Sequence, residues 1–130
     1  MAARHISNFI RINGKPFPTP KRYPNMVVTT AVNAARNANN KVVGQKIGRD
    51  NYKINNLEWP YLDAKTWSDM LKEFDKNYFF TVQFWDMVNN NWRTLTMYPG
   101  DRTADVFKID SDGRVLSYIN CKVNIIDAGW

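Results

Sequence analysis

Residues 78–102 read YFFTVQFWDMVNNNWRTLTMYPGDR, and this stretch decides the fold. In its first half, large apolar residues recur at every second position, at Phe80, Val82 and Phe84. Successive side chains of a strand point to opposite faces, so these three residues line one apolar face. Residues 91–98 alternate in the same way after an Asn-rich segment, and cross-strand aromatic and β-branched pairs can then form. The stretch predicts a stiff aromatic hairpin, which is typical of assembly or binding rather than catalysis.

Further strands follow from turn-forming residues along the chain. Asn13-Gly14 favours a type I′ turn, and the three prolines within residues 16–20 forbid a central strand there. Gly44 and Gly48 suggest a bulge or a close backbone approach, and Asn55-Asn56 suggests a second bulge. Strands are expected over residues 9–12, 25–32, 41–47, 51–59, 106–109 and 114–127, with a break over 33–40 and a turn over 110–113.

One helix is expected, over about Ala64–Lys76, with Asp63 as its N-cap. Its apolar positions, spaced as one helical stripe, are Trp67, Met70, Leu71 and Phe74. Its polar face is expected to hold Lys65, Asp69, Lys72, Glu73 and Lys76. The sequence therefore predicts a mainly β fold of the α+β type, a two-sheet β-sandwich or a partly closed barrel with this helix at its flank.

The composition suits one packed domain. The chain has 130 residues, of which 44% are apolar and 14% aromatic, so a globular core is expected. We expect a flexible tail over residues 1–8 and a single β-rich domain over residues 9–130. No run of eighteen apolar residues and no apolar signal segment is present, which predicts synthesis and residence in a cytoplasm.

The basic residues are concentrated in the first part of the chain. The formal net charge is +6, yet ten of the eighteen basic residues and only one of the twelve acidic residues, Asp50, lie within residues 1–53. Such a surface can bind nucleic acid through its phosphates or face an acidic partner. The cations are spread out rather than clustered in one block, so nucleic acid is possible as a partner but not favoured.

No catalytic, cofactor or metal site is predicted. His5 is the only histidine and Cys121 the only cysteine, too few for a catalytic triad or a zinc cage. Cys121 lies on the apolar face of an alternating strand, which predicts a buried structural thiol. The turn DSDG at residues 110–113 lacks the downstream Glu of a calcium-binding loop. In the loop GDRTAD, residues 100–105, we expect Arg102 to form an ion pair with a carboxylate.

The exposed aromatic residues of the hairpin leave two interpretations open. Phe79, Trp85 and Trp92 can stack on bases, as RNA-binding sheets do, or they can form a second core face or the anchor of a protein interface.

Several segments resemble a family of small phage-encoded proteins found among the tail genes of phages and prophages of Gram-positive bacteria. These segments are INGKPFPTP at 12–20, AARNANNKVVGQKIGRDNYKI at 34–54, the helix with Trp67 and Phe74, MYPGDRTA at 97–104 and CKVNIID at 121–127. The resemblance covers nearly all of the chain after residue 8. It implies a location in the virion, among the proteins of the tail.

The expected architecture is also similar to that of phage tail-tube proteins and of the N-terminal domain of distal tail proteins, which assemble into sixfold rings. By that analogy, a hairpin around Arg36–Arg49 reaches a neighbouring subunit, although an ordinary solvent loop is the alternative. DNA-conducting lumens tend to be acidic while this chain is basic. Its cations are therefore expected to face partner subunits, or the protein lies at the periphery of the tail.

The sequence thus predicts a non-enzymatic structural protein of a phage tail or baseplate. Its expected partners are other tail proteins and copies of itself in a ring, which the analogy makes hexameric. No membrane or small-molecule substrate is expected. The residues predicted to form its interfaces are Arg36, Lys41, Arg49, Trp59, Asp101 and Arg102. The alternative is a phage-encoded nucleic-acid-binding module that uses the basic first half and the aromatic sheet.

Overall fold

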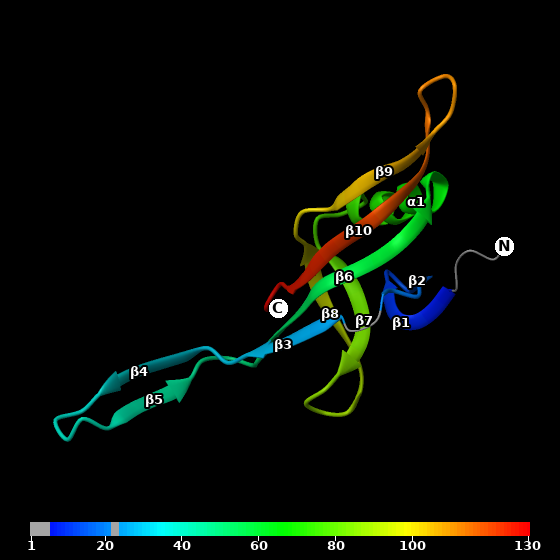
Figure 1. The fold of residues 1–130 in the computed structure, drawn as a ribbon. Helices are drawn as coiled ribbons and strands as arrows, with labels where there is room; N and C mark the ends of the chain where they lie inside the picture. Colours follow the sequence, from blue (N-terminus) through cyan, green and yellow to red (C-terminus); the bar gives the residue numbers. More distant parts are fainter. Residues whose placement is uncertain (1–5, 22–23) are drawn as a thin grey trace.

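The structure is a computed structural model that describes residues 6–21 and 24–130. Within these residues one helix, α1 (Ala64–Asp75), accompanies ten strands (Figure 1). The strands are β1 (Ile6–Ile12), β2 (Lys15–Pro18), β3 (Asn25–Thr29), β4 (Val32–Arg36), β5 (Val42–Lys46), β6 (Asn51–Asp63), β7 (Phe80–Asp86), β8 (Asn91–Pro99), β9 (Thr103–Ile109) and β10 (Val115–Asp127).

Eight of the strands form one antiparallel sheet, in the order β2-β1-β7-β8-β10-β6-β3, with β9 paired to β10 beside β8. The sheet is strongly curled and forms a half-barrel (Figure 1). β4 and β5 form a small second sheet of their own. The prediction of a mainly β fold with a partly closed barrel and one flanking helix is therefore confirmed.

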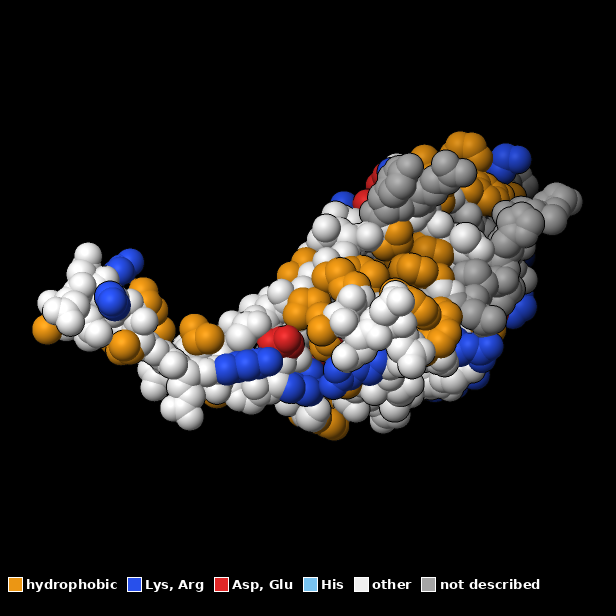
Figure 2. Space-filling view, turned by 90° about the horizontal axis from the view of Figure 1, so that it is seen from below, with side chains coloured by type: hydrophobic (Ala, Val, Ile, Leu, Met, Phe, Trp, Pro, Cys, Tyr) orange, Lys and Arg blue, Asp and Glu red, His pale blue; other side chains and the backbone are white. Residues whose placement is uncertain are grey.

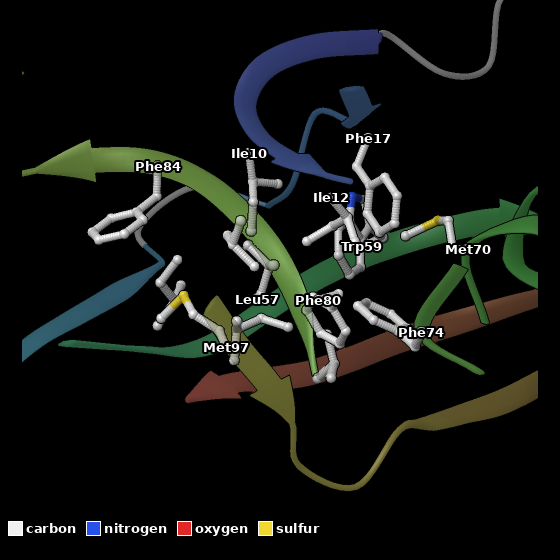
Figure 3. Close-up of a cluster of buried hydrophobic side chains, with 14 of the residues drawn as sticks. Ile10, Ile12, Phe17, Leu57, Trp59, Met70, Phe74, Phe80, Phe84 and Met97 are labelled. Atoms are coloured by element: carbon white, nitrogen blue, oxygen red, sulfur yellow. The ribbon is translucent and has the colours of Figure 1, made fainter. Parts of the chain in front are cut away.

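The core fills the concave side of the half-barrel and is closed by α1 (Figure 3). Phe80, Val82 and Phe84 of β7 are all buried, as their alternation predicted. Trp59 lies at the centre, where its ring contacts Phe17 edge-on and its Nε1 donates a hydrogen bond of 2.9 Å to the carbonyl oxygen of Pro18. This bond fixes β2 onto the core, so the proline-rich strand is anchored although it lies at the sheet edge.

The local predictions of a tight turn, a helix cap and a bulge were confirmed, because a few neighbouring residues determine each of these features. Asn13 and Gly14 both have positive φ, at 52° and 80°, as a type I′ turn requires. Asp63 caps α1 by accepting from the N–H of Thr66 at 2.9 Å. Between Ile54 and Leu57, β6 has one residue more than β10, so the predicted bulge is present.

Several predicted boundaries were wrong. β1 begins at Ile6 rather than Phe9, while residues 1–5 of the predicted tail lie outside the described residues. β4 occupies residues 32–36, where a break was expected, because pairing with β5 outweighs the weak strand propensity of its Asn and Ala residues. β6 continues through Pro60 to Asp63. β3 pairs with residues 51–55 only, so Pro60 lies where β6 has one strand neighbour and a missing N–H is tolerated.

Glu73 is buried, although its position on the helix predicted exposure. Its Oε1 accepts from Lys15 at 2.9 Å and from Lys76 at 3.2 Å, and its Oε2 accepts from Asn13 at 2.9 Å. Burial alone would raise the pKa of Glu73, but these three donors lower the pKa to about 2. The carboxylate thereby joins the β1–β2 turn to α1, a contact between residues about sixty positions apart that helical periodicity cannot predict.

We predict that Glu73 makes the protein acid-sensitive. Because the folded-state pKa lies below the ordinary value of 4.5, the contribution of Glu73 is fully present above that pH and is lost as the pH falls towards 2. The loss amounts to about 2–3 kcal/mol of unfolding free energy. Urea unfolding from pH 6 to pH 2 measures it. The difference between wild type and Glu73→Gln should shrink over this range, whereas an Asp69→Asn control, at an exposed carboxylate of the same helix, should track the wild type.

Candidate assembly interface

The second sheet projects from the body as an arm, defined here as residues 31–47, and Figures 1 and 2 show it standing clear of the rest of the molecule. Every residue of the arm is exposed. Four of them are large and apolar, with 50–62% of their surface accessible: Val32, Val42, Val43 and Ile47. A two-stranded hairpin on its own is at best marginally stable in water. The arm therefore presents two unpaired strand edges and apolar side chains that the body does not cover.

The arm has one charged and one uncharged face. Cross-strand pairing of Val32 with Lys46 and of Arg36 with Val42 puts both of these cations on one face. The opposite face is free of charge and holds Ala31, Asn33, Ala35, Val43, Gln45 and Ile47. This division is typical of a surface that packs against another protein. The uncharged face makes the contact, and the charged face meets water or charged groups.

The tip of the arm is closed by its own polar groups. The Asn37 side chain accepts hydrogen bonds from the N–H groups of Asn39 at 2.9 Å and Lys41 at 3.1 Å, and Asn40 has a positive φ of 62°. Arg36 donates to the carbonyl oxygen of Asn40 at 2.9 Å. The side chain of Lys41 makes no ion pair within the described residues. The tip is therefore a formed, positively charged turn.

Gly44 permits a close approach within the arm, as the sequence suggested. A Cβ at this position would lie 2.8 Å from the Cβ of Ala34 and 2.8 Å from the carbonyl oxygen of Asn33. Because one of these atoms belongs to the backbone, the two strands would have to separate to accept any side chain.

The root of the arm is fastened to the body by Arg49. Its Nη1 and Nη2 donate to the two carboxylate oxygens of Asp127 at 2.6 and 2.8 Å, and Nη2 also donates to the carbonyl oxygen of Trp130 at 2.9 Å. Asp127 is buried and also accepts from the N–H groups of Tyr52 and Gly129. Burial would raise the pKa of Asp127, but the hydrogen bonds from Arg49, Gly129 and Tyr52 lower it, so the carboxylate is ionised at neutral pH.

A second contact braces the root. Asp50 accepts from Thr30 at 2.7 Å and pairs with Lys46 at 3.0 Å, and these two hydrogen bonds lower the pKa of the Asp50 carboxyl. Thr30 lies between β3 and β4, just before the arm, and Lys46 is the last residue of β5. Hydrogen bonds and ion pairs therefore orient the arm at its root, whereas its length is free of the body.

A second exposed β-structure lies at the other end of the molecule (Figure 1). We call β9, the turn over 110–114 and residues 115–118 of β10 the flap. β9 pairs with β10 alone, so its outer edge is open. The exposed apolar residues of the flap are Val106, Phe107, Ile109 and Leu116, and the ring of Tyr61 in β6 meets Phe107 edge-on at 6.0 Å.

The acidic turn of the flap is a structural turn. One carboxylate oxygen of Asp110 accepts from the N–H groups of Asp112 at 2.8 Å and Arg114 at 2.9 Å, and Gly113 has a φ of 84°. Within residues 6–21 and 24–130, no group of His, Cys, Asp and Glu side chains is arranged to hold a metal ion. The DSDG sequence is thus used for a hairpin, as predicted.

The predicted interface residues do not form one patch. Arg36 and Lys41 lie on the arm, and Arg49 lies at its root. Asp101 and Arg102 lie in the exposed turn between β8 and β9, where Arg102 contacts Asp75 of α1 at 3.6 Å. The predicted ion pair of Arg102 therefore exists, but its partner lies outside the GDRTAD loop.

Two of the predicted interface residues have structural roles. Trp59 is only 1% exposed, so its assignment to an interface is corrected: its ring is needed at the centre of the core. Arg49 forms an ion pair with Asp127 of the same chain. A substitution of Arg49 would therefore destabilise the fold, whether or not Arg49 contacts another subunit.

Sequence reasoning missed the apolar part of both exposed structures. The residues concerned are Val32, Val42, Val43 and Ile47 on the arm and Val106, Phe107, Ile109 and Leu116 on the flap. In the sequence they are short apolar runs next to cations or acids, which also occur in ordinary strands. The sequence of the arm did contain one signal. Neither face of this hairpin is apolar throughout, so neither face can be buried in a core.

Three smaller predictions concern reactive groups and membranes. Cys121 is fully buried, and desolvation raises the pKa of its thiol to about 11, so the prediction of a buried structural thiol is confirmed. His5 lies outside the described residues. No helix among the described residues is long and apolar enough to span a membrane.

Comparisons of the chain with protein-family models, with curated proteins and with solved structures find no significant match.

We predict that Arg49→Ala destabilises the isolated protein by about 3 kcal/mol, because it leaves the buried carboxylate of Asp127 without its charged partner. Arg49→Lys should recover only part of this loss, since an ammonium group cannot bind both oxygens in the fork geometry. Urea unfolding of dilute monomer measures the effect. An unchanged urea midpoint for Arg49→Ala would contradict this structural role, and Arg49 would again be a candidate interface residue.

We also predict that Gly44→Ala opens the arm while leaving the body folded. The added methyl group meets backbone atoms of β4, so cross-strand pairing should be lost locally. In NMR spectra, amide contacts between β4 and β5 should disappear while resonances of the core keep their positions. Gln45→Ala, at the next position, which is exposed, is the matched control and should keep the β4–β5 contacts.

Proposed function

We propose that this chain is a non-enzymatic structural subunit of a phage tail or baseplate, which assembles with copies of itself into a ring. The observation that carries the proposal is the arm, a projecting hairpin with exposed apolar residues and two open strand edges. Exposed strand edges of this kind pair readily with other chains. The phage context comes from the sequence segments at 12–20, 34–54, 97–104 and 121–127, and the half-barrel with one helix is compatible with it.

The occupant that we propose for the arm is the flap of a second copy. The two structures lie at opposite ends of the molecule, so a contact between them is head-to-tail and generates a ring when the rotation closes. Both carry exposed apolar residues and open edges. The arm contains three cations and no acid, while the flap holds three acidic residues, Asp105, Asp110 and Asp112, against two basic ones, Lys108 and Arg114. This charge division favours the head-to-tail encounter over contact between two arms.

The basic character of the chain suits contacts with neighbouring subunits better than it suits the wall of a DNA-conducting lumen, which tends to be acidic. Lys15, Lys21, Lys46 and Arg49 are neutralised by carboxylates of the same chain. The cations of the arm that have no carboxylate partner within the described residues are Arg36 and Lys41. These two are the charges that an acidic neighbouring surface would meet.

The alternative is a nucleic-acid-binding module, and the net charge of +6 favours it. Against it stand the same four ion pairs, which reduce the free positive charge of the first half. Binding of this kind would weaken steeply between about 50 and 200 mM salt. A gel-shift assay with single- and double-stranded DNA at both salt concentrations tests the alternative.

We predict that Arg36→Glu combined with Lys41→Glu prevents self-assembly of a folded protein. Reversing both charges puts like charges opposite an acidic neighbour, and like-charge contacts cost several kcal/mol at an interface. Light scattering across protein concentration, with electron microscopy of the same samples, should show rings or discrete oligomers for the wild type and monomers for the variant.

The control for this experiment is Lys65→Glu combined with Lys72→Glu on the exposed side of α1. It makes the same change of net charge away from the arm and should leave assembly intact. Equal loss of assembly in both double variants would mean that net charge alone acts. Normal assembly of the arm variant would contradict the role proposed for the arm.

A further inference from the structure

A hollow of about 410 Å³ lies where the start of β7, the middle of β8 and the last described residues meet. Its walls include Tyr78, Phe79 and Trp130, together with Asn77, Thr81 and Thr96. Trp130 is 71% and Tyr78 61% exposed, whereas aromatic rings of this size are commonly buried. The volume falls within the range of small-ligand sites.

The exposed rings are held in place. The ring of Trp130 lies 4.7 Å from that of Phe79, and Tyr78 stacks on Tyr98 at 5.4 Å with an angle of 26° between the planes. The carbonyl oxygen of Trp130 accepts from Arg49, and the N–H of Ala128 donates to Thr96 at 3.0 Å. The rings are therefore oriented before any ligand arrives, which lowers the entropic cost of binding.

The polar groups around the hollow have hydrogen-bonding capacity to spare. Within the described residues, no hydrogen bond is made by the Asn77 amide, the Tyr78 and Tyr98 hydroxyls or the indole N–H of Trp130. No side chain that lines the hollow carries a charge. The guanidinium of Arg49, which donates to the carbonyl oxygen of Trp130, is already bound to Asp127.

These features select the chemistry of the ligand. A nucleic-acid strand can stack on aromatic rings, but its phosphates need cations along the groove, and the hollow has none. A purely apolar ligand would leave the amide and hydroxyl groups unsatisfied. A sugar ring presents C–H groups on its faces and hydroxyl groups at its edge, so it matches aromatic faces flanked by neutral donors and acceptors.

We infer that this hollow is a binding site for a neutral carbohydrate, with one or two sugar rings stacked against Trp130 and Tyr78 and hydrogen-bonded by Asn77. The site shares no residue with the arm or the flap, so its test is separate from that of the proposed assembly.

The test is a titration with a panel of neutral trisaccharides built from glucose, galactose or N-acetylglucosamine. Binding is followed by the fluorescence of tryptophan and by NMR shifts of the Asn77 side-chain amide. We expect at least one member of the panel to bind with a dissociation constant near about 1 mM or tighter. Trp130→Ala should weaken this binding at least tenfold, and Asn77→Ala, which breaks no hydrogen bond of the fold, should weaken it severalfold.

The matched control is Trp92→Ala, because Trp92 is also an exposed indole but packs on Trp85 outside the hollow. It should leave the affinity unchanged. The inference is overturned if no trisaccharide binds at about 10 mM, or if Trp130→Ala binds as tightly as the wild type. It is also overturned if an oligothymidine, and no sugar, shifts the Asn77 amide in a salt-dependent way.

Discussion

The buried carboxylate of Asp127 is the point on which the arrangement of the molecule depends. It receives both guanidinium nitrogens of Arg49 at the root of the arm, the N–H of Tyr52 in β6 and the N–H of Gly129 beyond β10. One ionised group thus sets the direction of the arm, begins the long β6–β10 pairing and orients the residues that lead to Trp130. Removing either charged partner would loosen the arm and the aromatic hollow together, although these lie in different parts of the fold.

Sequence patterns were sufficient to predict features that depend on interactions between residues close together in the chain. The alternation of Phe80, Val82 and Phe84, the positive φ of the Asn13-Gly14 turn and the Asp63 cap each depend on a few neighbouring residues, and each was predicted correctly. Contacts between distant segments could not be predicted in this way. Glu73, Arg49 and Trp59 all look like surface or interface residues in the sequence, yet each has its partner between about forty and eighty positions away.

The arm and the flap are a second case in which the sequence pattern was not sufficient, because residues that look like core residues are exposed there. Their apolar residues resemble those of ordinary core strands, but the topology leaves β4, β5 and the outer edge of β9 without neighbours in the chain. In the proposed assembly these two ends, one basic and one within the more acidic part of the sequence, meet head to tail, and the contact covers both. The aromatic hollow lies apart from both ends and remains open for a ligand in such an arrangement.

The most direct test of this account is amide hydrogen exchange of residues 31–47 and 103–118, measured on the same protein as a dilute monomer and after concentration into oligomers. We expect rapid exchange of outward-facing amides in both segments of the monomer, and strong protection of both in the oligomer, while the core strands stay protected throughout. Protection of the arm in the dilute monomer, or oligomers in which both segments still exchange rapidly, would contradict the claim that these two ends join neighbouring copies.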